Sequence, residues 1–422
     1  MFETVTPKTP YLSMASFEES LARMVAQACP TNIVERAPSK AVGAVLAEDL
    51  IAPISVPTFD NSAMDGFAFA SADVAAASSA KPVNLPVVGA SIAGDTAGLS
   101  RLQPGLAAKI MTGAPVPEGA DTILPVEFAS WAHEKLTFYE AYPAGKHVRR
   151  IGEDVRAGAQ LLKKGIRLEA QHIPLLCALG LNRIKSYKTP RMAWIATGQE
   201  ISDDFDAPLS PGHIYNATGL YGAVSAADMG LDVAATVTVR DTPQDFSGAL
   251  DDALDSKVDI IISTGGVSAG QYDFVKPVLE DMGAQILVHK ARIKPGKPVL
   301  FARLPDGTYF FGLPGNPIST ALALRAFVYP FVRALSGLPA EAHKTGRLLH
   351  ACKTSFDRTV FLMAKADVDE KGTVILNPQS NQQSFQTLPF AGSNAWILAP
   401  EGVEMLEAGS LVQWLPLKPN IF

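Results

Sequence analysis

The sequence predicts a multidomain protein of the α/β plus β class. It has a central α/β domain on a parallel sheet, an inserted β-rich domain and a C-terminal domain like a β-barrel. Apolar strands alternate with helical patterns between residues 190 and 335, which is typical of a parallel sheet covered on both faces. Short alternating runs broken by glycine and proline fill residues 50–148 and 346–420. The 422 residues suffice for roughly two to four domains.

The first part of the chain predicts a split domain around the β-rich insertion. Ser16 and Glu19 have the spacing of a capping box that begins a helix. A second helical pattern covers residues 168–179 and ends at Gly180, a typical C-terminal cap. We expect these two helices to pack on each other. The predicted domain boundaries are 1–48 with 149–186 for the split domain, 49–148 for the insertion, 187–335 for the α/β domain and 340–422 for the C-terminal domain.

The α/β domain is predicted from apolar strands and the helices between them. The strands are expected at 191–197, 231–239, 258–263, 284–293, 298–303 and 308–312. The helices are expected at 217–229, from the Thr242-Pro243 pair, from Asp273 as a cap, and at 318–335. Asp306-Gly307 predicts a tight turn that joins the last two strands.

Composition and charge exclude several classes of protein. The net charge of −6 provides no overall field for nucleic acid or an anionic membrane. Cys29, Cys177 and Cys352 are few and far apart, which fits a reducing compartment and no disulfide framework. The N-terminal segment lacks the pattern of a signal peptide, and no apolar stretch approaches the roughly 20 residues of a spanning helix. A cytoplasmic location is therefore expected.

Polar and flexible residues follow five strands of the α/β domain. Ligands of open α/β sheets bind beyond the carboxyl ends of the strands, so these segments should meet at one site. The five segments are "TGQE" (197–200), Arg240-Asp241, "STGGVSAGQYDF" (263–274), "KPGKP" (294–298) and "GLPGNP" (312–317). Each segment alone is more simply explained as a turn, a helix cap or solvated surface, and their shared position favours a site.

These segments carry the chemistry for a phosphorylated ligand and a divalent ion. Glycines let a backbone approach a ligand, and successive amides cradle oxyanions. Lys294 and Lys297 supply positive charge. Glu200, Asp241 and Asp273 could hold a hard cation such as Mg²⁺, which commonly bridges carboxylates and phosphate oxygens.

Three segments outside the α/β domain also have unusual patterns. Residues 60–70 place several polar residues in one turn, 109–127 carry Thr112-Gly113 and a proline-rich turn, and 149–162 interleave acids and bases around Gly152. Each alone reads as a structural loop. Because they lie in other domains, a shared site would have to form across domains or between subunits.

Six segments together resemble the molybdopterin molybdenumtransferase family in order and spacing. They are "FDNSAMDGFA", "IMTGAPVPEGADTILPVE", "GEDVRAGAQLL", "ISTGGVSAGQYDF", "IKPGKPVLFARL" and "FFGLPGNPIST". This family comprises bacterial molybdenum-insertion enzymes and is similar to one region of gephyrin-type proteins. The resemblance covers residues 12 to 415 and implies four structural parts, including a molybdopterin-binding α/β domain. It also implies a homodimer whose site combines the α/β domain of one subunit with the inserted domain of the other.

The reaction implied by the resemblance is insertion of molybdate into adenylylated molybdopterin, with Mg²⁺ present and AMP released. The implied catalytic acids are Asp65, Asp154, Glu200, Asp241 and Asp273, of which the last three are metal ligands. The implied binding residues are Thr112, Ser263, Thr264, Gly265, Gly266, Ser268, Lys294, Lys297, Pro314, Gly315, Asn316 and Pro317. The resemblance also implies, as partners, the adenylyltransferase of the pathway and maturation proteins of molybdoenzymes.

The sequence departs from the family pattern at three places. Gln199 and Gln271 stand where the family usually has acids, and residues 216–218 read "NAT" in place of a "DSN"-like segment. These changes motivate an alternative, in which the chain binds or delivers molybdopterin or the finished cofactor without full turnover. A nucleotide pyrophosphatase is a third, weaker alternative, because the resemblance extends over all domains.

Overall fold

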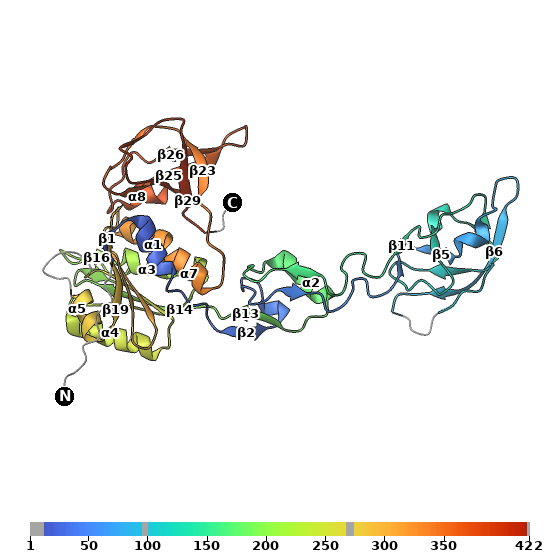
Figure 1. Cartoon of the computed structure of the whole chain (residues 1–422), viewed down its shortest axis with the longest axis horizontal. Helices are drawn as coiled ribbons and strands as arrows, with labels where there is room; N and C mark the ends of the chain where they lie inside the picture. Colours follow the sequence, from blue (N-terminus) through green and yellow to red (C-terminus); the bar gives the residue numbers. More distant parts are fainter. Residues whose placement is uncertain (1–11, 95–99, 267–273, 420–422) are drawn as a thin grey trace. The chain divides into compact units, whose positions relative to one another are not determined.

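The computed structural model describes residues 12–94, 100–266 and 274–419 (Figure 1). The chain forms two compact units, each of which is described by itself. Unit 1 comprises Met1–Glu35, Gly43–Ala47 and Lys185–Phe422, and unit 2 comprises Arg36–Val42 and Glu48–Ile184. The four predicted domain boundaries stay a prediction.

Unit 1 contains the predicted α/β sheet, with seven strands in the order β1-β19-β21-β22-β18-β14-β17. Every pairing is parallel except the two that β21 makes with β19 and β22. The strands are β1 (Leu12–Ala15), β14 (Arg191–Thr197), β17 (Asp232–Val239), β18 (Ile260–Thr264), β19 (Gln285–Ala291), β21 (Leu300–Arg303) and β22 (Tyr309–Leu313). The sequence did not predict β1, which is short and lies at the sheet edge.

β21 runs opposite to its neighbours because a tight turn joins it to β22. Gly307 N donates to Leu304 O at 2.9 Å, and Gly307 has φ +97°, which a side chain would strain. The predicted Asp306-Gly307 turn is therefore confirmed. It makes the sheet mixed rather than entirely parallel.

Helices cover both faces of this sheet (Figure 1). Trp194 and Ile262 belong to one buried cluster, and the adjacent Ile195 and Ile261 belong to another on the opposite face. Successive residues of a strand point to opposite faces, so strands buried on both sides read as continuous apolar runs. The helices are α1 (Phe17–Val25), α3 (Ala217–Asp228), α4 (Pro243–Asp255), α5 (Val275–Asp281), α6 (Pro317–Ala323) and α7 (Tyr329–Leu335), with the π-helical η5 (Leu324–Val328) between α6 and α7.

α1 begins as predicted and packs on the core of unit 1. Ser16 Oγ accepts from Glu19 N at 3.2 Å, and Glu19 Oε2 accepts from Ser16 N at 3.0 Å. Phe17 packs on Phe327 with ring centroids 5.4 Å apart, so α1 covers the unit 1 core. The segment at 168–179 contains α2 (Ile173–Ala178), which belongs to unit 2, and its expected packing on α1 stays a prediction. The apolar face of a helix predicts that this face is buried, but it does not identify the element on which the helix packs.

One described helix, Pro317–Leu335, is long and apolar enough to span a membrane by length and composition. The expectation that no apolar stretch approaches this length is therefore wrong. However, 83% of its apolar window is buried inside the fold, as in a core helix. Its Arg325 is 1% exposed, donates to Pro416 O at 2.7 Å and pairs with Glu341 at 2.8 Å. Burial lowers the pKa of Arg325, and the Glu341 carboxylate opposes that shift.

The C-terminal part of unit 1 is a closed barrel, which confirms the predicted β-barrel-like domain. Its strands pair in the order β25-β26-β23-β29-β27, and β27 pairs back to β25. They are β23 (Lys344–Leu348), β25 (Thr359–Val368), β26 (Val374–Pro378), β27 (Ala395–Ala399) and β29 (Leu411–Pro416), with β20 (Ile293–Lys294) beside β25 and α8 (Thr387–Ala391) between β26 and β27. Trp396 and Trp414 are buried in this part of the chain.

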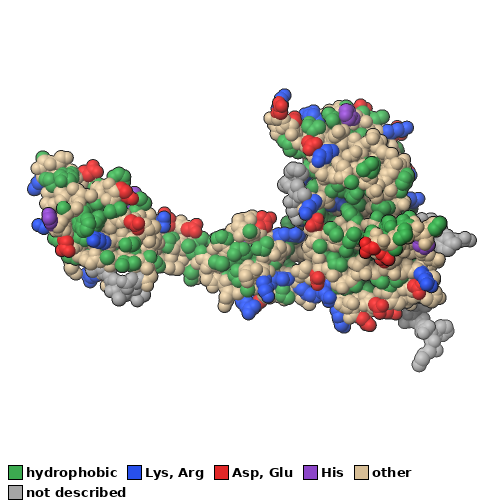
Figure 2. Space-filling model, turned by 180° about the vertical axis from the view of Figure 1, so that it is seen from behind, with side chains coloured by type: hydrophobic (Ala, Val, Ile, Leu, Met, Phe, Trp, Pro, Cys, Tyr) green, Lys and Arg blue, Asp and Glu red, His purple; other side chains and the backbone are tan. Residues whose placement is uncertain are grey.

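Unit 2 contains a second sheet, in the order β8-β5-β7-β6-β10-β9. Its strands are β5 (Gly66–Phe69), β6 (Val83–Ser91), β7 (Ala107–Ile110), β8 (Thr122–Pro125), β9 (Ser130–Ala132) and β10 (Lys135–Phe138). Phe69 and Phe138 pack in its core with centroids 4.6 Å apart. On the face shown in Figure 2, acidic and basic side chains are interspersed with apolar ones in each unit.

Short elements complete the chain. The paired strands are β2 (Ile33–Arg36) with β13 (Ile184–Tyr187), β3 (Leu50–Ile51) with β12 (Gln160–Leu162), β4 (Asn61–Ser62) with β11 (Val148–Arg149), β15 (Ile201–Ser202) with β16 (Ile214–Tyr215), and β24 (Cys352–Lys353) with β28 (Met405–Leu406). The single-turn helices are η1 (Pro38–Lys40), η2 (Ser71–Val74), η3 (Val126–Phe128) and η4 (Ala170–His172).

Candidate functional site

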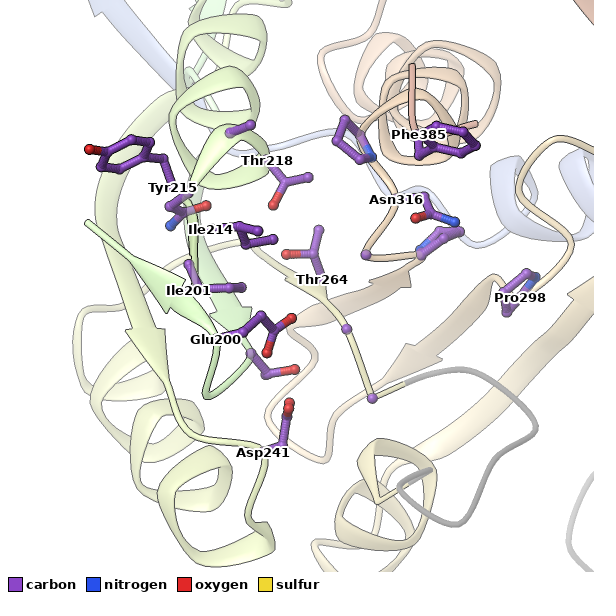
Figure 3. A pocket seen from close by; sticks show the side chains of 18 residues that line it. Glu200, Ile201, Ile214, Tyr215, Thr218, Asp241, Thr264, Pro298, Asn316 and Phe385 are labelled. Atoms are coloured by element: carbon purple, nitrogen blue, oxygen red, sulfur yellow. The ribbon is translucent and has the colours of Figure 1, made fainter. Parts of the chain in front are cut away.

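A cavity of about 620 Å³ opens beyond the carboxyl ends of the unit 1 strands (Figure 3). Residues that follow β14, β17, β18 and β22 line it, together with Pro298 of the "KPGKP" segment. The barrel contributes Phe385. The structure thus brings residues from all five predicted strand-end segments to one place.

The glycines after β18 are required by the packing of the loop itself. Gly265 has φ +93°, and a Cβ there would lie 2.4 Å from Thr197 Oγ1. Gly266 has φ +62°, and a Cβ there would lie 2.9 Å from Val275 Cγ2. Such distances are too short for side-chain carbon, so the loop packs closely on β14 and α5. These glycines therefore serve the tight turn after β18, in addition to any close approach of a ligand.

Two hydroxyl groups in the cavity wall have no hydrogen-bond partner among the described residues. They are Thr197 Oγ1 and Thr264 Oγ1, on side chains that are 5% and 2% exposed. Figure 3 shows Thr264 and Thr218 within the cavity wall. Both oxygens are covered by protein atoms, and unpaired buried atoms also occur outside the cavity lining, for example at Ser263 and Trp194, so these two hydroxyls do not by themselves indicate a ligand. Thr197 was missed as a site residue, although "TGQE" was singled out.

Glu200 and Asp241 both line the cavity, at the end away from Phe385 (Figure 3). Their carboxylates follow two neighbouring parallel strands, β14 and β17. Within the described ranges no group of three His, Cys, Asp or Glu residues could hold a metal ion. The third predicted ligand, Asp273, lies outside the described residues, as do Ser268 and Gln271. The predicted cap of Asp273 on the following helix is outside them too.

The segment after β22 is held by its own hydrogen bonds. Thr320 Oγ1 donates to Pro314 O at 2.6 Å, and Thr320 N donates to Asn316 O at 2.9 Å. Pro317 occupies the first turn of α6, as its missing N–H allows. Pro314, Gly315, Asn316 and Pro317 all line the cavity. Four predicted binding residues are therefore presented by a firmly held turn.

Other predicted binding residues do not line the cavity. Lys294 and Lys297 are exposed, and within the described part of the chain neither pairs with a carboxylate. Ser263 is fully buried in β18, where its Oγ has no described partner. Only Pro298 of the lysine-bearing segment reaches the wall.

Asn216 at the start of α3 has a structural role. Its Oδ1 accepts from Gly219 N at 2.7 Å, and its Nδ2 donates to Asp203 Oδ1 at 2.8 Å and Thr238 Oγ1 at 2.9 Å. The side chain is 4% exposed, and its bond from Gly219 N is buried. A carboxylate at this position could not donate the two Nδ2 bonds. Asn216 therefore fits this chain better than an acid would.

In unit 2, Asp65 and Thr112 are in contact. Asp65 Oδ1 accepts from Thr112 N at 2.7 Å and from Thr112 Oγ1 at 2.9 Å. These bonds, the backbone one first, lower the pKa of the exposed Asp65 carboxyl. Asp154 is also exposed, and its N–H donates to Val56 O at 3.0 Å.

The three unusual segments of unit 2 meet around Asp60. Asp60 accepts from Ile151 N at 2.7 Å and from Arg150 Nη1 at 2.6 Å. The Ile151 bond, followed by the Arg150 guanidinium, lowers the pKa of Asp60. Val116 N donates to Asp60 O at 3.0 Å, which adds the 109–127 segment. Sequence reasoning placed Asp60 in a turn and missed that it joins all three segments.

Comparison with known proteins gives matches along nearly the whole chain. Three family models match: "MoeA N-terminal region (domain I and II)" at residues 15–180, "Probable molybdopterin binding domain" at 193–334 and "MoeA C-terminal region (domain IV)" at 345–417. A molybdopterin molybdenumtransferase from Synechococcus elongatus is 35% identical, covering 95% of this chain and 98% of the relative. Molybdopterin molybdenumtransferase 2 from Mycobacterium tuberculosis is 36% identical, covering 89% and 93%.

The fold is similar to that of a solved relative. The crystal structure of a molybdopterin biosynthesis MoeA protein from Pyrococcus horikoshii superposes with a TM-score of 0.84 at 30% identity. The superposition covers 96% of this chain and 99% of the other.

Proposed function

Because the chain belongs to the molybdopterin molybdenumtransferase family, we propose that it inserts molybdate into adenylylated molybdopterin and releases AMP. Membership of the family establishes a transferase role in molybdenum cofactor biosynthesis. The finer reaction is our proposal. The observation that supports it best is the unit 1 cavity, where five strand-end segments meet and the carboxylates of Glu200 and Asp241 lie together.

The cavity fits the chemical groups of this reaction. Water attacks the phosphorus at the pterin end of the pyrophosphate link, that P–O bond breaks, and AMP leaves with the electron pair. The two thiols of the pterin dithiolene form bonds to molybdenum, and one molybdate oxygen leaves as water with the thiol protons. The glycines of the wall, Gly266 and Gly315, let phosphate or molybdate oxygens approach the backbone closely. The close packing of Gly265 on Thr197 and of Gly266 on Val275 holds this wall in position.

The donor set also fits Mg²⁺. Glu200 and Asp241 are hard oxygen ligands at one end of the cavity, and Mg²⁺ is usually held by one or two carboxylates with substrate phosphates and waters. When bound, the ion would neutralise charge that develops on the phosphate oxygens. Without the ion, the two carboxylates would repel an anionic substrate, so the proposal requires a cation there.

The test uses the full-length protein with adenylylated molybdopterin, molybdate and MgCl₂. We expect AMP release, measured by chromatography, together with active cofactor, measured by reconstitution of a cofactor-free molybdoenzyme. Glu200→Gln and Asp241→Asn should each lower AMP release by about tenfold or more, because each removes a metal ligand. Asp251→Asn, an exposed acid on α4 outside the cavity lining, should leave it unchanged. No AMP and no cofactor from the unsubstituted protein would overturn the proposal.

The same assay separates the alternatives. AMP release without cofactor formation would indicate a pyrophosphatase, and tight pterin binding without AMP release would indicate a delivery protein. The homodimer, the partner proteins and the cytoplasmic location expected from the sequence remain proposals. Light scattering of the purified chain would test the homodimer.

A further inference from the structure

The barrel contributes an aromatic side chain to the cavity. Phe385 follows β26 and precedes α8, and 64% of its surface is exposed. Figure 3 shows it at the opposite end of the cavity from Glu200 and Asp241. A large apolar ring that is open to a cavity gains stabilisation when a ligand covers it.

The backbone that carries Phe385 is anchored on two sides. Gln382 Oε1 accepts from Met363 N at 2.8 Å, and its Nε2 donates to Met363 O at 3.0 Å, which ties the segment to β25. Ser384 O accepts from Ile318 N at 3.2 Å, which ties it to α6. Contacts with β25 and α6 therefore fix the backbone on the N-terminal side of Phe385.

The surroundings of Phe385 favour a flat, apolar ligand face. Pro298, Pro314 and Pro317 line the cavity with rigid rings that carry no side-chain donors. Tyr215 is the other aromatic residue in the lining, and its ring is stacked on Phe205 at 5.5 Å and 17°. Phe385 stacks on no aromatic ring within the described residues. Its face is thus available to a ligand.

We propose that Phe385 determines specificity by stacking on a planar heterocyclic ring of the substrate, while the acidic end of the cavity receives the phosphate-bearing part. This inference rests on the proposed function, because adenylylated molybdopterin carries two such rings, adenine and pterin. Stacking of a base on an aromatic side chain changes affinity by about 5- to 150-fold. Both rings have the same stacking chemistry, so the experiment needs separate probes that carry only adenine or only a pterin.

The experiment measures dissociation constants by calorimetry on the full-length chain, with MgCl₂ present. The probes are AMP, neopterin monophosphate and ribose 5-phosphate, which lacks a ring. The variants are Phe385→Ala, Phe385→Trp and Leu388→Ala. Leu388 is the matched control, because it lies on α8, is 84% exposed and does not line the cavity.

We expect Phe385→Ala to weaken one ring-bearing probe by about tenfold, and Phe385→Trp to keep its affinity. Loss for AMP would identify the adenine as the stacked ring, and loss for neopterin monophosphate would identify the pterin. Ribose 5-phosphate and Leu388→Ala should show no change. Equal affinities of Phe385→Ala and Leu388→Ala for both ring-bearing probes, or no binding of either probe to the unsubstituted chain, would overturn the inference. Failure of cofactor formation alone would count against the proposed function and leave ring binding intact.

Discussion

Substitution of Gly265 by alanine tests whether packing requires the glycine after β18. The added Cβ would lie 2.4 Å from Thr197 Oγ1 and 2.6 Å from Thr197 O. The second atom is backbone of the central strand β14, whose register is fixed by pairing on both sides. The positive φ of +93° adds strain that glycine avoids.

The expected loss of unfolding free energy follows from these two costs. A side chain in a left-handed conformation costs about 1–2 kcal/mol, and overpacking in a closely packed site costs about 1–3 kcal/mol. Together they predict a loss of roughly 2–5 kcal/mol for Gly265→Ala. Urea unfolding followed by tryptophan fluorescence measures it, because Trp194, Trp396 and Trp414 are buried in unit 1.

Gly315→Ala is the matched control in the same cavity wall. Its added Cβ would lie 3.8 Å from Gly265 Cα, an ordinary contact, and its φ is not in the left-handed region. We expect its unfolding midpoint to stay within experimental error of the unsubstituted chain. Equal midpoints for the two variants would refute the packing argument and return Gly265 to a role in ligand approach alone.

Three further substitutions test other contacts. Asn216→Asp places a carboxylate oxygen about where Asn216 Nδ2 lies, 2.8 Å from Asp203 Oδ1, so repulsion should raise the pKa of the carboxylate pair. The loss of stability should be largest near neutral pH, where both groups are ionised, and should shrink on acidification. Thermal melts across pH would show this trend. Glu341→Ala removes the partner of a buried guanidinium, and urea unfolding should show a loss of about 3 kcal/mol. Thr112→Val removes one of two donors to Asp65, whose pKa is lowered. Ionised Asp65 adds stability that is present above its unfolded pKa and lost as pH falls through its folded pKa. In Thr112→Val the folded pKa of Asp65 should rise toward its ordinary value, so this stability should be lost at higher pH. A carboxyl NMR titration measures the change in pKa.

The central sheet could be predicted from sequence because its strands are buried on both faces. Runs such as Ile260–Ile262 leave no solvent face, which indicates a sheet between helical layers. The reversed direction of β21 followed from a local signal, the Asp306-Gly307 turn. The edge strand β1 could not be predicted, since "LSMA" has no distinctive pattern until it pairs with β19.

Parts of the candidate site could be predicted for a similar reason. Parallel strands place their carboxyl ends at one edge, so Glu200 and Asp241 were expected to meet there. Phe385 could not be found this way, because it belongs to the barrel and reaches the cavity beside Ser384, whose carbonyl accepts from Ile318 N, 66 residues earlier in the chain. Lys294 and Lys297 show the opposite failure: their sequence position suggested the cavity, and only the neighbouring Pro298 lines it.

The departures from the family pattern now separate into different kinds. Asn216 donates two hydrogen bonds that an acid could not donate, so this change is compensated by Asp203 and Thr238. Gln199 is exposed and does not line the cavity, so its amide does not remove a metal ligand from the cavity wall. The alternative in which the chain binds or delivers molybdopterin without full turnover therefore depends mainly on Gln271. Gln271→Asp should raise AMP release if that alternative holds, with Gln199→Asp as the control. Equal rates for both variants and the unsubstituted chain would mean that the amides are neutral and that the acids lining the cavity suffice.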